Sequence, residues 1–160
     1  MIEELIDLLS CNELAPTEVA AMAEFVRRAP EDPELDWIED STQAMTFAIC
    51  SSLMEFVAAG DKVDELHEQL QAMFADPLPA YPYDDEAIRD SSYAYFRWLD
   101  GILATRGTTE GGYELLSIDV GLDDQLQVLA VKRKDSPRIL ELSELLMVRI
   151  SRENGIESWN

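Results

Sequence analysis

The sequence predicts an α+β fold: a mostly helical single domain with a small antiparallel β-hairpin or three-stranded sheet near the C-terminus. Apolar residues recur at helical spacing through most of residues 1–110. Two runs rich in Val, Ile and Leu, residues 113–120 and 125–132, then flank the turn-forming stretch 121–124. A chain of 160 residues is long enough for one hydrophobic core and short for two, so a single domain is expected over residues 1–160.

The helices of the first part begin and end at recognisable residues. Apolar residues at helical spacing begin at Ile2, and Pro16 suits the first turn of a second helix. Asp40, with Gln43 three residues later, resembles a capping box. A helix that is apolar nearly all round is therefore predicted over residues 41–59, and such a helix belongs in the middle of a protein.

Two further helices are expected before the hairpin. Gly60 ends the apolar helix and Asp61 caps the next one, which carries apolar residues at positions 63, 66, 70 and 74. Three prolines exclude a helix over residues 77–83, because proline removes a backbone donor and restricts the residue before it. A long helix is predicted over residues 84–106, with an apolar face widened by aromatic residues.

The last part of the chain, residues 111–152, is expected to hold the hairpin, a helix and a third short strand. Neither hairpin strand alternates cleanly between apolar and polar residues, so both faces should be partly covered by helices. Pro137 stands in the first turn of the helix, and Leu145 is among its expected buried residues. Alternation at residues 147–151 predicts the third strand, and residues 153–160 are expected to fray.

The charge of the chain bears on its partners. The formal net charge is −21, from 33 acidic and 12 basic side chains. Such a field repels nucleic acid and anionic membranes and attracts basic proteins or cations. The alternative is that acidity serves only to keep the protein soluble. The acidic N-terminus, the lack of an apolar run of membrane-spanning length and two cysteines without CxxC spacing predict a cytoplasmic protein with reduced thiols.

The stretch from Pro30 to Asp40 is dense in carboxylates and contains no basic residue. Trp37 lies within it, and an aromatic anchor beside negative charge suits a basic partner. The alternative is that Trp37 packs a loop against the body of the protein. The candidate partner-binding residues are Glu34, Asp36, Trp37, Glu39 and Asp40.

The single histidine, His67, excludes several kinds of catalytic site. It is followed by Glu68, but Gln71 stands where a zinc protease needs its second histidine. No nucleophile elbow is present, and Cys11 and Cys50 lie in apolar helical contexts. His67 is therefore interpreted as a solvent-facing helix residue, and no catalytic residue is predicted.

The aspartates of the hairpin are the best candidates for a cation site. Asp119, Asp123 and Asp124 place three oxygen donors within six positions, which suits loose binding of Mg²⁺ or Ca²⁺. Metal-dependent nucleases carry a second acid on the following strand, where this chain has Ala130. The alternative is that these aspartates form the turn. No other cofactor is predicted.

Two segments, LDWIED at residues 35–40 and GYELLSIDVGLDD at residues 112–124, carry a resemblance to a known family. They resemble an acidic bacterial domain family of unknown function, whose members share a Trp-acid segment and a Gly-Tyr-x-Leu…Asp-x-Gly-x-Asp hairpin. The resemblance spans most of the chain from Leu35 onward. It implies a bacterial source and no particular activity.

Two functions are compatible with these patterns. The first is a non-catalytic binding protein, regulatory or immunity-like, that occupies a basic protein surface. The second is a divalent-cation-dependent enzyme or sensor that uses the hairpin aspartates.

Overall fold

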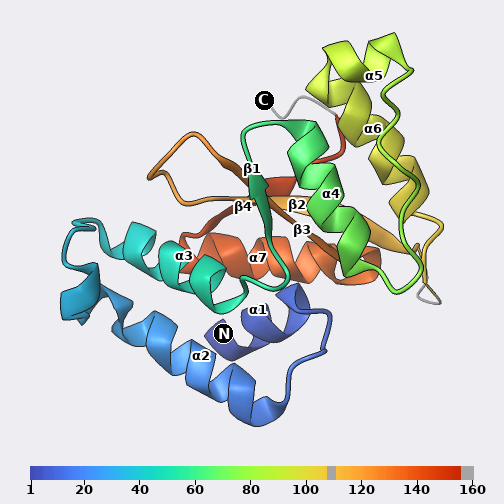
Figure 1. Ribbon diagram of the computed structural model, residues 1–160. Coiled ribbons are helices and arrows are strands. Elements are labelled where there is room, and N and C mark those ends of the chain that lie inside the picture. The colour runs from blue at the N-terminus through green and yellow to red at the C-terminus, as the bar shows by residue number, and fades with distance from the viewer. Residues whose placement is uncertain (108–110, 156–160) are drawn as a thin grey trace.

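A computed structural model describes residues 1–107 and 111–155 (Figure 1). In this part of the chain, a four-stranded antiparallel sheet has the strand order β1-β3-β2-β4. The predicted hairpin is confirmed as β2 and β3, which pair from Tyr113–Lys132 to Ser117–Val128. The predicted third strand is β4, which pairs with β2. The strands are β1 (Ala58–Gly60), β2 (Tyr113–Asp119), β3 (Leu126–Lys132) and β4 (Arg149–Arg152).

Helices make up most of the remaining described structure, so the predicted mostly helical α+β class is confirmed. None of these helices combines the length and apolar character that a membrane span requires. The tail was expected to fray over residues 153–160. This was wrong for residues 153–155, because the Glu153 amide donates to the Leu115 carbonyl (2.9 Å) and Arg97 donates to the Gly155 carbonyl (3.2 Å). Residues 156–160 lie outside the described part. The α-helices are α1 (Ile2–Leu9), α2 (Pro16–Arg28), α3 (Ser41–Ser52), α4 (Val63–Met73), α5 (Glu86–Asp90), α6 (Ser92–Leu103) and α7 (Ser136–Leu146), with short 3₁₀ turns η1 (Ala29–Glu31), η2 (Pro33–Leu35) and η3 (Arg133–Asp135).

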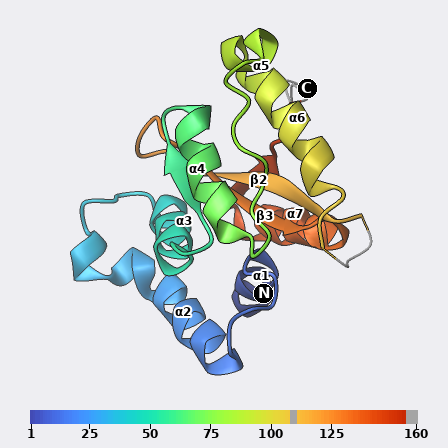
Figure 2. The same cartoon turned by 45° about the vertical axis from the view of Figure 1, so that its right-hand side comes forward.

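Helices cover both faces of the sheet, as the poor alternation of the hairpin strands predicted. On β2, Leu116 and Ile118 belong to one hydrophobic cluster, whereas Leu115, which precedes Leu116 and points to the opposite face, belongs to another. The first cluster joins the sheet to α1, α2, α3 and α7, and the second joins it to α4, α5 and α6. The two helical layers are visible on either side of the strands in Figures 1 and 2.

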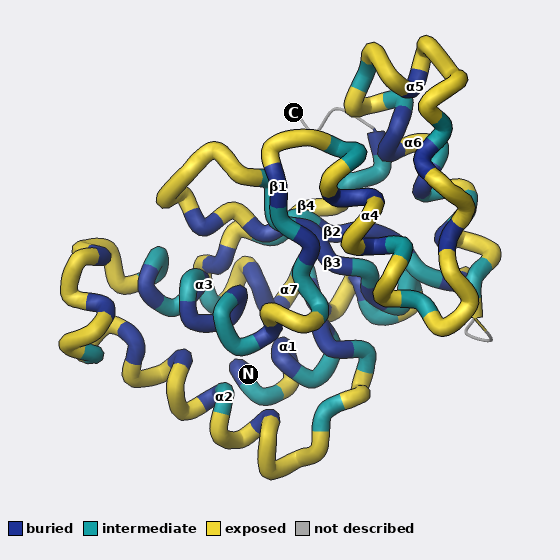
Figure 3. Tube along the Cα trace, in the orientation of Figure 1, coloured by how far each residue is buried: buried dark blue, intermediate teal, exposed yellow. Residues whose placement is uncertain are grey.

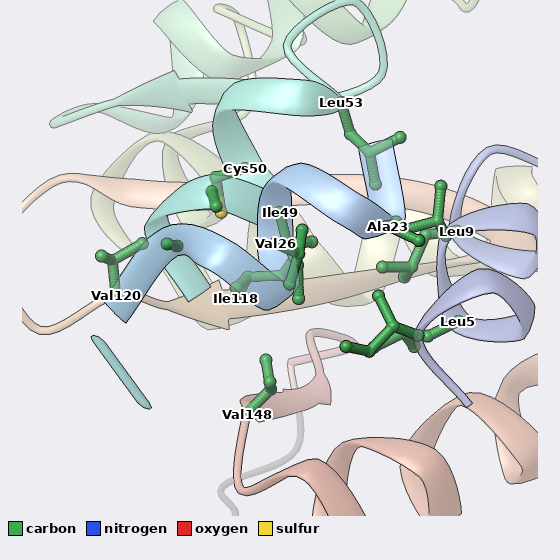
Figure 4. Packing of buried hydrophobic residues seen from close by; sticks show 14 of the residues in the cluster. Leu5, Leu9, Ala23, Val26, Ile49, Cys50, Leu53, Ile118, Val120 and Val148 are labelled. Carbon is green, nitrogen blue, oxygen red and sulfur yellow. The ribbon is translucent and has the colours of Figure 1, made fainter. Parts of the chain in front are cut away.

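The first cluster is built where three helices meet the sheet. Figure 4 shows side chains of α1, α2 and α3 in one cluster with Ile118 of β2. Leu5, Ile49 and Leu53 are fully buried there. Burying each such aliphatic side chain contributes about 1.5–3 kcal/mol, so this cluster fixes α3 against β2.

Helix α3 is shorter than the helix predicted over residues 41–59. The backbone leaves the helix at Leu53, and the amide of Phe56 donates to the Leu53 carbonyl in a turn (2.8 Å). Residues 58–60 then pair with β3 as β1. The prediction was wrong beyond residue 52 because pairing with a strand distant in the sequence outweighed the local helical pattern.

The helix predicted over residues 84–106 is divided into α5 and α6. Ser91 between them has extended backbone angles (φ −142°, ψ 120°), and its hydroxyl accepts a hydrogen bond from the amide of Ala94 (3.3 Å). Two other expectations were also wrong. Leu145 is 60% exposed on α7, and His67 is fully buried instead of facing solvent.

Burial of His67 follows from the segment of residues 77–83. Leu78 and Tyr81 of this segment are buried against α4 and α6 and so cover the histidine. The ring nitrogens of His67 lie 2.9 Å from the Tyr95 hydroxyl and 2.6 Å from the Pro79 carbonyl oxygen. Both ring nitrogens are therefore engaged inside the protein, and burial lowers the pKa of His67 despite the hydrogen bond to Pro79.

Candidate functional site

The acidic segment that follows α2 is held in place by its own apolar and capping residues. Leu35 and Ile38 are buried in the first hydrophobic cluster. The Asp32 carboxylate accepts a hydrogen bond from the amide of Glu34 (2.9 Å), which stabilises the 3₁₀ turn η2. Most of the remaining segment is exposed, as the loop between α2 and α3 shows in Figure 3. Leu35 and Ile38 thus anchor the segment to the protein, and most of its carboxylates face solvent.

Trp37 combines an exposed ring with fixed contacts. Its side chain is 59% exposed. The indole nitrogen donates to the backbone carbonyl of Glu34 (3.1 Å), and the ring meets Phe47 of α3 edge to face, with 5.5 Å between centroids. The packing role that the sequence left open is therefore present, and the residue still has more than half of its surface exposed. A partner would meet an aromatic side chain that is already oriented.

The carboxylates around Trp37 divide into two kinds. Glu34, Asp36 and Glu39 have exposed side chains. Asp40 is the N-cap of α3, and its carboxylate accepts hydrogen bonds from the amides of Thr42 (2.9 Å) and Gln43 (3.0 Å) as well as from the Thr42 hydroxyl. The hydrogen bond from the Thr42 hydroxyl, together with those from the amides of Gln43 and Thr42, lowers the pKa of Asp40.

The structure brings Asp40 together with Asp119, which the sequence placed in a different candidate site. Both line a hollow of about 90 Å³ between the start of α3, the end of β2 and the start of β4. Arg149 lies in the same hollow, with 3.6 Å between its guanidinium and the Asp119 carboxylate. The Gln43 amide reaches across to the carbonyl of Gly121 (3.5 Å). The Arg149 guanidinium therefore partly neutralises the negative charge of this hollow.

The other two hairpin aspartates lie beyond the hollow. The Asp123 carboxylate accepts a hydrogen bond from the amide of Gln125 (3.0 Å), which is the turn-forming role given above as the alternative. Asp124 is exposed. Across residues 1–107 and 111–155, no three His, Cys, Asp or Glu side chains are grouped so that they could hold a metal ion. Mg²⁺ or Ca²⁺ binding at these aspartates stays a prediction.

We call the surface around Trp37 and this hollow the acidic edge. Exposed Met147 (72%) borders the hollow with a left-handed backbone conformation, and it adds an apolar side chain to this surface. The acidic edge comprises Glu34, Asp36, Trp37, Glu39, Asp40, Asp119 and Met147.

Most arginines of the protein are engaged in ion pairs elsewhere. Arg138 makes a two-pronged contact with Glu4 (2.8 and 2.9 Å), and Arg133 lies 2.8 Å from Asp100. Further pairs with carboxylates involve Arg27, Arg28, Arg89, Arg106 and Arg152. Most of the arginines are thus paired with carboxylates of the chain itself, and the acidic edge carries more acidic than basic side chains.

Sequence reasoning missed a larger concavity, a pocket of about 540 Å³ near the C-terminal end of α4. Its lining residues come from positions 11 to 130, and each of them looks like an ordinary helix, turn or strand residue in its local context. No sequence pattern could have indicated it.

Comparison of this chain with protein families, curated proteins and solved structures finds no match in any of the three. The resemblance to an acidic bacterial domain family therefore stays a prediction.

Proposed function

We propose that the protein is a non-catalytic, regulatory or immunity-like binding protein, and that its acidic edge docks on a basic surface of a partner protein. The observation that carries this proposal is the exposed, oriented ring of Trp37 in a segment that has no basic residue. The segment contains six carboxylates, those of Glu31, Asp32, Glu34, Asp36, Glu39 and Asp40.

Aromatic and charged groups contribute to binding in different ways. Trp, Tyr and Arg dominate the binding energy of protein interfaces, because they bury large surfaces in desolvated contacts. Rim carboxylates contribute mainly to the rate and selectivity of association with a basic surface. The hydrogen bond of Trp37 to Glu34 and its contact with Phe47 reduce the entropy lost when the ring is buried by a partner.

The proposal is tested by affinity capture from extracts of the source cell, followed by titration of the purified partner. The partner is expected to be basic, and its association rate should fall steeply between low and high salt. Trp37→Ala should weaken the complex by about 2 kcal/mol, roughly thirtyfold, as truncation of an aromatic hot spot does. Asp36→Asn together with Glu39→Gln should slow association and leave dissociation nearly unchanged.

Two controls separate this result from loss of structure. Phe25→Ala truncates another exposed aromatic residue, on α2 and outside the acidic edge, and should leave affinity unchanged. Thermal unfolding of each variant checks that the fold is intact. Failure to recover any basic protein at low salt, or equal affinity of Trp37→Ala and the Phe25→Ala control, would refute the proposal.

A further inference from the structure

The pocket of about 540 Å³ lies at the edge of the sheet, beyond the point where the short outer strand β1 stops pairing with β3. Strand β1 pairs with β3 from Leu126 to Val128, and β3 continues to Lys132. Next to Ala130 of β3, the thiol of Cys11 lies 3.5 Å from the backbone carbonyl. The chain before β1 turns away at Phe56, which leaves a space between the end of α1, this turn and the end of α4.

Apolar side chains, three of them aromatic, form one part of the lining of this pocket. Phe56, Met73, Phe74 and Tyr113 all line it, with Ala130 on the strand. The rings of Phe74 and Tyr113 pack edge to face, with 5.7 Å between centroids. A volume of about 540 Å³ lies within the range of small-molecule sites, and it suits a ligand larger than a single ion.

The rim of the pocket carries three carboxylates, Glu13, Glu55 and Asp76, against one guanidinium, that of Arg106. The guanidinium of Arg106 is held by hydrogen bonds to the backbone, since it donates to the carbonyls of Asp76 (2.7 Å) and Pro77 (3.3 Å). Glu13 and Glu55 form no ion pair with any cation in the described part of the chain. Their negative charge is therefore free to act on a ligand.

Charge from the rim reaches the interior of the pocket. Burial is the main cause that raises the pKa of Tyr113, and the charge of Glu13 adds to it. Burial likewise raises the pKa of the Cys11 thiol, again with a contribution from Glu13. The same negative charge would attract a cation inside the pocket, and the faces of the aromatic rings would add a cation–π contribution.

We propose that this pocket binds a small organic cation, an amine or guanidinium that carries an apolar body. The body packs against Phe56, Phe74 and Tyr113, and the cationic group lies at the rim beside Glu13 and Glu55. No residue of the acidic edge lines the pocket, so this inference is independent of partner binding.

The test uses three ligands with one apolar body and different head groups: phenethylamine (cationic), phenethyl alcohol (neutral) and hydrocinnamate (anionic). Calorimetric titration of the full chain measures affinity, and amide shifts in ¹⁵N-labelled protein locate the contact. Phenethylamine should bind most tightly and should shift the amides of Phe74 and Tyr113. Equal binding of the three ligands, or no binding of the amine, overturns the inference.

Two double variants test whether the negative charge that attracts the amine is local to the pocket. Glu13→Gln with Glu55→Gln should weaken amine binding about fivefold, because two exposed ion pairs are lost. The matched control, Glu68→Gln with Glu144→Gln, makes the same change in net charge at exposed positions outside the pocket and should have no effect. An equal loss of affinity in both double variants would contradict a local site.

Ala75→Trp provides the steric arm of the test. Ala75 is exposed and lines the pocket, so an indole there fills the space without changing any charge. Amine binding should fall below detection in this variant, while its unfolding temperature stays close to that of the wild type. Retained binding with unchanged amide shifts would overturn the assignment of the pocket.

Discussion

The buried pair of His67 and Tyr95 supports a quantitative prediction about stability. Burial raises the pKa of Tyr95, so its hydroxyl stays protonated. The carbonyl of Pro79 can only accept, and the nitrogen of His67 that faces it (Nε2) must carry the proton. The other ring nitrogen (Nδ1) therefore accepts from the Tyr95 hydroxyl across 2.9 Å. The geometry fixes one neutral tautomer of the histidine.

Tyr95→Phe removes this donor and leaves a buried acceptor without a partner. A loss of this kind costs about 1–3 kcal/mol, and the change in side-chain volume is small. For a chain of this length the loss corresponds to a fall in Tm of roughly 2–12 °C. Urea unfolding followed by circular dichroism measures the difference. Tyr83→Phe is the control, since Tyr83 is 55% exposed, and it should change stability by less than about 0.5 kcal/mol. Equal stability of the two variants would refute the hydrogen-bond assignment.

The same pair gives stability a pH dependence with a defined sign. Because burial lowers the pKa of folded His67, the unfolded chain takes up the proton first as the pH falls below about 6.5. Stability from this residue is therefore complete at neutral pH and declines below about 6.5, by at most about 1.4 kcal/mol per pH unit. His67→Gln retains a donor for the Pro79 carbonyl and does not titrate. The difference between wild type and His67→Gln should shrink as the pH falls, and a difference that grows would show that the sign is wrong.

Three further predictions concern a cap, a glycine and the thiols. Ser91→Ala should destabilise the protein by about 1 kcal/mol in thermal unfolding, because the Ser91 hydroxyl caps α6. Gly112→Ala should cost at least about 2 kcal/mol in urea unfolding, since Gly112 has φ +67° and an added Cβ would lie 2.4 Å from the Ala104 carbonyl oxygen. In timed alkylation with iodoacetamide followed by mass spectrometry, Cys11 should react more slowly than a free thiol and Cys50 more slowly still, because burial raises both pKa values, that of Cys50 to about 12.

Each of these three predictions has an internal comparison. Ser92→Ala, one residue beyond the cap and exposed, should leave stability nearly unchanged. Gly101→Ala should stabilise the protein by about 0.5–1 kcal/mol, because Gly101 lies inside α6 and an added Cβ there meets nothing within 4 Å. Equal alkylation rates for the two cysteines would contradict the burial argument.

The parts of the fold that the sequence predicted correctly are those with local signals. The hairpin follows from two β-rich runs around Gly121, and α7 follows from Pro137 in its first turn. Strand β1 had no such signal. Ala58 favours a helix, and it becomes a strand residue only because Val128 of β3 lies opposite. Burial of His67 likewise had no local signal. The segment of residues 77–83 covers the histidine only because the chain bends after α4 and folds back over it.

The candidate sites differ in how far sequence could reveal them. The acidic segment and Trp37 are contiguous, so composition pointed to them directly. Composition did not show that Asp40 is occupied as a helix cap or that Asp119 faces Arg149. The pocket beside Ala130 draws on segments that meet only through the sheet and its helices, and its lining depends on where β1 stops.

Salt concentration distinguishes the two proposed binding sites on physical grounds. The carboxylates of the acidic edge face open solvent, and added salt screens their attraction for a partner over distances of about 8–10 Å. In the pocket, the apolar body of the ligand contributes through contact with Phe74 and Tyr113, and this contribution does not weaken with salt. Partner association should therefore fall steeply with salt while amine binding falls little. If both decreased in parallel, the excess charge of −21 alone would account for binding, and neither surface would need its aromatic residues.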